Sequence, residues 1–128
     1  MDEKEKLDSI LTNALKKEIE THVKDLKEKD AKLKIVYPII VEGEEYDDKE
    51  YYLAYFRQPN FTIFSKYLTF SQKDQAVAMR ALATDCFIDG DKALVDDDSL
   101  FLFGLFPQLG RLIQMRNGRL VNLSKAGK

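Results

Sequence analysis

The 128-residue sequence contains no tryptophan, one cysteine and one histidine. A single cysteine and a single histidine cannot form a disulfide framework, nor can they close a zinc site by themselves. A lone thiol is also typical of proteins from reducing compartments, so we expect a cytoplasmic location.

Long apolar runs are missing as well. The longest compact one, residues 100–106, is interrupted by Gly104 and followed by Pro107, far short of the roughly 18 residues that cross a bilayer. The polar N-terminus lacks the apolar centre of a signal peptide. There is no glycine-rich phosphate loop, serine nucleophile elbow or HExxH motif. We therefore expect no membrane association, cofactor, metal or catalytic residue.

The composition that remains is that of a folded domain. The chain is 45% hydrophobic and 33% charged, with a mass of 14.8 kDa, which predicts one domain over residues 1–128. The net charge of −2 excludes a global basic field for nucleic acid. The charge is unevenly spread, because residues 35–64 are acidic whereas residues 99–128 contain five basic and no acidic side chains.

Residues 4–30 have the periodicity of one long amphipathic helix within segment 1–32. Its apolar positions recur every three or four residues: Leu7, Leu11, Leu15, Ile19, Val23 and Leu26. Such a helix would be roughly 40 Å long, more than a small domain covers. We expect part of it to project or to self-associate.

The period changes to that of a β-hairpin over residues 33–57. Residues 33–41 alternate, with Pro38 indicating an edge strand, and residues 50–57 are rich in aromatic side chains that favour strands. A lone hairpin is marginal in water, so we expect a helix or a partner chain across it.

Residues 60–117 are predicted to be helical, which makes the fold class α+β with about three helices after a hairpin or small antiparallel sheet. Asn60 is expected to cap the first helix, and a capping box from Ser71 to Asp74 to open the second. The turn at Asp89, Gly90 and Asp91 precedes a third helix over residues 98–116, which should bend or restart at Pro107, and residues 118–128 form a frayed basic tail. The expected apolar face of the second helix comprises Ala76, Val77, Met79, Ala83, Cys86 and Phe87.

Three candidate sites favour structural interpretations. Residues 85–96 have the length of an EF-hand loop, but the apolar Phe87 and the final Asp96 depart from its ligand pattern. His22 is expected to be buried or interfacial, since no motif places a partner for catalysis beside it. Cys86 lies in an apolar stripe and is expected in the core. For residues 100–106, core burial is favoured over an exposed patch.

The order of several short motifs resembles the tail assembly chaperones of long-tailed bacteriophages and prophages, over roughly residues 35–117. The sequence Phe56-Arg57-Gln58-Pro59 joins an aromatic strand to a helix, and a later Gly90-Asp91 turn precedes an acidic helix start. Members of this family often have an F-R-K-P-like step, so Gln58 stands where a second basic residue is common.

This resemblance implies a non-enzymatic protein of the bacterial host cytoplasm. It would bind the tape measure protein, a long helical polypeptide, and help to recruit tail tube subunits. The family pattern falls on Arg57, Pro59, Gly90 and Asp91, for which a structural role is the simpler interpretation. The expected contact residues are Tyr51, Tyr55, Phe56, Leu100, Phe101, Phe103 and Phe106.

An alternative function stays open from sequence alone. The basic tail could serve a small regulatory or DNA-associated module, which a salt-dependent shift with duplex DNA would reveal. The tail lacks interleaved aromatic residues for base stacking, so nucleic-acid binding is the weaker interpretation.

Overall fold

The computed structural model describes residues 8–100, 105–113 and 117–123, and it confirms the α+β class. Helix α2 (Asn13–Lys29) precedes strands β1 (Val36–Glu42) and β2 (Tyr51–Arg57). Helices α3 (Phe61–Ser71) and α4 (Gln75–Cys86) follow, then strand β3 (Phe87–Gly90). The last described elements are short: α5 (Ala93–Asp96), α6 (Asp98–Leu100), α7 (Phe106–Leu109) and a 3-10 turn, η2 (Gly110–Leu112).

The three strands form one antiparallel sheet in the order β1-β2-β3. The expected hairpin is confirmed, with Val36 opposite Arg57 and Glu42 opposite Tyr51. Strand β3 was not expected, because Phe87 was assigned to the apolar face of a helix. Instead α4 ends at Cys86, Phe87 turns to extended backbone at ψ 131°, and Phe87 pairs with Phe56 of β2. A third strand makes the sheet more stable than a two-stranded hairpin.

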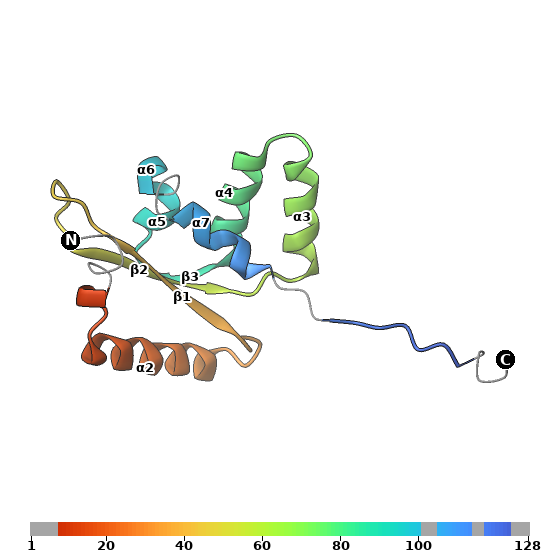
Figure 1. Cartoon of the computed structure of the whole chain (residues 1–128), viewed down its shortest axis with the longest axis horizontal. Coiled ribbons are helices and arrows are strands. Elements are labelled where there is room, and N and C mark those ends of the chain that lie inside the picture. Colours follow the sequence, from red (N-terminus) through yellow and green to blue (C-terminus); the bar gives the residue numbers. More distant parts are fainter. Residues whose placement is uncertain (1–7, 101–104, 114–116, 124–128) are drawn as a thin grey trace.

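Both faces of the sheet are covered, which explains why β2 has aromatic or apolar residues at every position before Arg57. Successive side chains of a strand point to opposite faces. Thus Ala54 and Phe56 join the larger core with residues of α4, α5 and α7, whereas Leu53 and Tyr55 pack in a second cluster with residues of α2. Figure 1 shows the same layers, with α2 on one side of the sheet and the other helices on the opposite side.

The first helix is shorter than the sequence predicts. Residues 8–10 are helical, but the helix breaks at Leu11 and Thr12, and α2 begins anew at Asn13. The break follows from helix capping, because the hydroxyl of Thr12 accepts a hydrogen bond from the backbone N–H of Leu15 at 3.1 Å. The described helix does not project: Leu15 and Leu26 are buried, and α2 packs on β1.

The capping predictions for α3 and α4 have different outcomes. Asn60 caps α3 as expected, its Oδ1 accepting from Ile63 N–H at 2.9 Å. The capping box was misplaced, since Ser71 ends α3 and Asp74 caps α4. The buried face of α4 also differs from the expected one, because Ala76 is exposed and Val77 is 50% exposed. The residues that α4 buries are Ala78, Leu82, Ala83 and Cys86.

The helix expected over residues 98–116 is described only in part. Residues 98–100 (α6) and 105–112 (which include α7 and η2) are helical, whereas Ile113 is extended, so the helix ends earlier than expected. Pro107 starts α7 at its first turn, where its missing N–H costs nothing, and α7 ends at Leu109 before Gly110. Leu105, Leu109 and Leu112 are fully buried. Leu105 is the one residue of the apolar run 100–106 whose side chain is described, and it belongs to the core.

Candidate functional site

Helix α3 presents an apolar face that the other described residues leave largely open. Phe61, Phe64 and Leu68 follow one another at intervals of three and four residues, which places them on one side of the helix. No residue of α3 is buried, and Phe61 and Leu68 are 83% and 45% exposed. We call these three side chains the α3 face. Contiguous apolar surface of this kind marks interaction sites on folded proteins.

A small cleft of about 190 Å³ continues the α3 face toward the sheet. Its walls come from the joint between β2 and α3 and from η2 with Ile113, and they include Phe61 and Phe64. Pro59, one of the residues on which the family pattern falls, lines this cleft beside Leu112. Because Phe61 and Phe64 belong to both, the cleft adjoins the α3 face, and Gln58 and Asn60 add polar groups to its walls.

The contact residues predicted from the sequence lie elsewhere. Phe56 is fully buried and Tyr55 is 6% exposed, so both are core residues and offer almost no surface to a partner. Tyr51 is half-buried at a groove described below. The other predicted contacts lie outside the described residues, either entirely or by their side chains: Leu100, Phe101, Phe103 and Phe106.

Gly90 and Asp91 hold β3 against β2. Gly90 has φ +112°, and a Cβ there would lie 2.5 Å from the backbone oxygen of Leu53, so only glycine fits without strain. The carboxylate of Asp91 accepts from Leu53 N–H at 2.8 Å and pairs with the ammonium of Lys49. Arg57 ends β2 and is half-buried. These positions of the family pattern thus have structural contacts in this chain.

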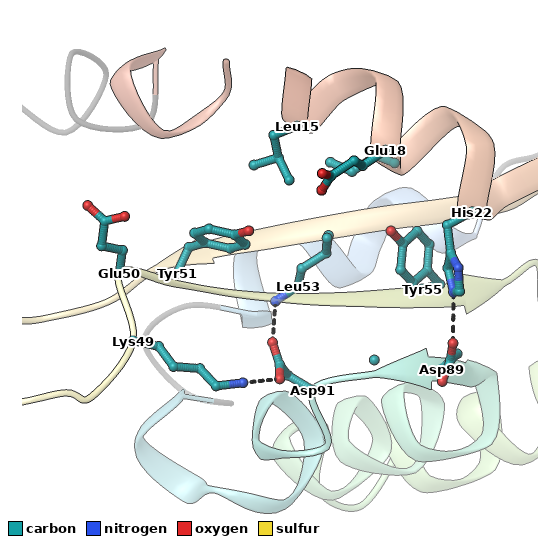
Figure 2. A pocket seen from close by; sticks show the side chains of 12 residues that line it. Leu15, Glu18, His22, Lys49, Glu50, Tyr51, Leu53, Tyr55, Asp89 and Asp91 are labelled. Carbon is teal, nitrogen blue, oxygen red and sulfur yellow. Dashed lines mark hydrogen bonds and ion pairs between the residues drawn. The ribbon is translucent and has the colours of Figure 1, made fainter. Parts of the chain in front are cut away.

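An open groove of about 610 Å³ separates α2 from β2 and β3. Figure 2 shows His22 of α2 reaching Asp89 of β3, with Nε2 and Oδ2 2.7 Å apart, beside the ring of Tyr55. Sequence reasoning missed this pair because its members lie 67 positions apart. His22 was expected to be buried or interfacial, and its side chain is 38% exposed at the rim of the groove.

Burial controls the ionisation of the groups that could act chemically. Burial raises the pKa of the Cys86 thiol to about 12, with Asp85 adding to the rise and Arg57 opposing it. Burial, followed by the charge of Asp89, also raises the pKa of Tyr55. The thiol of Cys86 is neutral at neutral pH and has no exposed surface, which confirms the expected core role and makes it a poor nucleophile.

The acidic residues within positions 85–96 do not converge on one cation. Asp85 pairs with Lys66 at 3.0 Å, Asp89 with His22, and Asp91 with Lys49. Within the described ranges, no group of three or more potential ligands could hold a metal ion. A search of the same residues finds no helix with the length and hydrophobicity of a membrane span.

Comparisons with models of protein families, with curated proteins and with solved structures found no match to this chain.

Proposed function

We propose that this protein is a non-catalytic chaperone of phage tail assembly that works in the cytoplasm of the bacterial host. It binds the tape measure protein, keeps it soluble and helps to recruit tail tube subunits. The proposal rests on the resemblance of the sequence, and the observation that carries it is the open α3 face.

The α3 face suits a helical partner. A stripe of large apolar side chains at helical spacing accepts the apolar side of another amphipathic helix, and the adjoining cleft offers a hole for a protruding side chain. Each large apolar side chain that becomes fully buried contributes about 1.5–3 kcal/mol. Burial of Phe61 and Leu68 with their partner side chains gives reversible binding.

The groove between α2 and the sheet supports a role without catalysis. Four of its ionisable groups are already paired with one another, namely His22 with Asp89 and Lys49 with Asp91. Cys86, the sole thiol of the chain, is a core residue. Neither arrangement supplies an activated nucleophile in contact with solvent.

Co-expression with a tape measure protein, followed by affinity capture, tests this proposal. The unaltered chain should bring down the long helical protein, and the double variant Phe61→Ser with Leu68→Ser should lose it. Tyr46→Ser is the matched control, because Tyr46 is 85% exposed but lies in the loop between β1 and β2. Circular dichroism and urea unfolding should show that both variants are folded. Failure to capture any tape measure protein, or equal capture by the folded double variant, would refute the proposal.

A further inference from the structure

The groove between α2 and the sheet has an apolar floor and an acidic rim. Leu15 and Ile19 of α2 face Leu53 of β2 across it, and the carboxylates of Glu18 and Glu50 stand at its edges. Figure 2 shows Glu18 reaching from α2 toward the sheet near Tyr51, and Glu50 just before β2. The groove is open along its side, so it can admit a length of polypeptide.

Two of the four carboxylates in the groove, those of Glu18 and Glu50, have no cationic partner among the described residues. Asp89 and Asp91 are paired with His22 and Lys49. Among the described residues, no hydrogen bond or ion pair engages the side-chain carboxylates of Glu18 and Glu50. With four carboxylates against Lys49 and His22, the groove favours a segment that combines a positive charge with apolar side chains.

The chain itself contains such a segment. Residues 117–123, which we call the C-terminal arm, are extended and exposed. Leu120, Val121 and Leu123 are 93%, 69% and 79% exposed, and Arg119 is exposed beside them. Figure 1 shows the arm running away from the helices and the sheet on the side of α3. Burial of such exposed aliphatic side chains against another apolar surface lowers the free energy of the protein in water.

We propose that the C-terminal arm of a second copy of this chain docks in the groove. In an extended segment, Arg119, Val121 and Leu123 point to one side and Leu120 to the other. The guanidinium of Arg119 meets Glu18 and Glu50 at the rim, while Val121 and Leu123 cover the half-buried Ile19 and Leu53. The first helix thereby contributes to self-association through its groove side. The proposal is independent of the α3 face and of the chaperone function.

Sedimentation of the full chain over a range of concentrations tests the proposal. The unaltered protein should associate reversibly, and more weakly as salt rises, because Arg119 and the rim attract each other through screened charges. Val121→Ser with Leu123→Ser should weaken association about tenfold or more. Leu120→Ser is the matched control on the opposite side of the arm and should have a smaller effect.

Charge reversal identifies the two halves of the contact. Glu18→Lys with Glu50→Lys reverses the charge of the groove rim, and Arg119→Glu reverses the charge of the arm. Each variant alone should therefore sediment as a monomer at concentrations where the unaltered chain associates. Because the reversed charges complement each other, the mixture of the two should associate. Glu20→Lys and Arg111→Glu are the controls, since both residues are exposed and neither lies in the groove or the arm.

Three outcomes would overturn the proposal. The first is a chain that stays monomeric at every concentration, which includes the case of an arm that folds onto its own groove. The second is association that the arm and groove variants leave unchanged. The third is a mixture of charge-reversed variants that remains monomeric.

Discussion

Helices α3 and α4 are neighbours of nearly equal length that pack against each other, yet they differ in a way that reverses simple expectation. Six of the eleven residues of α3 are large apolar or aromatic side chains, and none is buried. Helix α4 contains four alanines among its twelve residues, and four of its residues are buried. The more apolar helix is therefore the more exposed one.

The difference shows that the place of a helix relative to the sheet, more than its hydrophobicity, decides how far it is buried. Ala78 and Ala83 are fully buried, and their small side chains let α4 lie close to the sheet, where Leu82 and Cys86 join the larger core. Helix α3 packs on α4 and stands beside it, past the end of the sheet (Figure 1). Phe61 and Leu68 therefore stay exposed, which is why we propose α3 as the binding surface.

The largest difference between the two helices is expected in the free energy of unfolding, when one leucine of each helix is replaced by alanine. Leu82→Ala should lower the free energy of unfolding by about 2–5 kcal/mol, because it leaves a cavity in a fully packed core. Leu68→Ala should change it by less than about 1 kcal/mol, since Leu68 is 45% exposed. Urea unfolding measures both. Equal losses would contradict the layered arrangement.

The buried edge of α4 also predicts a pH dependence. The pKa of Cys86 is about 12 in the folded chain against a usual 9.0, so the unfolded thiol loses its proton first as pH rises. The stabilisation is complete below about pH 9 and is lost progressively as pH rises toward 12. Urea unfolding from about pH 8 to about pH 11 should show a steeper loss of stability in the parent than in Cys86→Ala. Parallel curves for the two proteins would contradict the assigned burial.

The N-terminal caps should not distinguish the helices, because a cap acts on local backbone groups. Asp74 accepts from Ala76 N–H at 3.0 Å, and Asn60 accepts from Ile63 N–H at 2.9 Å. Asp74→Ala and Asn60→Ala should each cost about 1 kcal/mol in urea unfolding. A cost confined to one of the two variants would mean that the other helix does not need its cap.

The smallest effect lies in the ion pair that joins the two helices. Lys66 of α3 and Asp85 of α4 are 3.0 Å apart with partly exposed side chains. Lys66→Ala should cost less than about 1 kcal/mol, because solvent screens a surface pair. The double-mutant cycle with Asp85→Ala isolates the pair's contribution. A coupling of several kcal/mol would show that charge, and not packing, holds α3 in place.

Local patterns predicted much of this fold because they depend on neighbours in the chain. The alternation and aromatic content of residues 33–57 indicated the hairpin, and Asn60 indicated the start of α3. The missed features depended on contacts between distant segments: β3 needs β2 beside it, and Asp89 meets His22 only after α2 covers the sheet.

The candidate site was less accessible to sequence reasoning. The aromatic strand looked like a contact surface, but Tyr55 and Phe56 are buried because both faces of β2 are covered. The stripe at Phe61, Phe64 and Leu68 was visible as a helical pattern, and the same pattern would fit a buried helix equally well. The available signal was the excess of large side chains on α3 over the small residues of α4.

The amino-acid sequence alone determined the α+β class, the hairpin, the cap at Asn60 and the structural character of Cys86, because each depends on local propensity or on composition. The tertiary structure alone decided that α2 covers the sheet, that β3 completes it and that α3 stays open. These outcomes depend on which surfaces meet when the layers pack. An apolar pattern states that a face will be covered, but only the packing shows whether the cover comes from the same chain or from a partner.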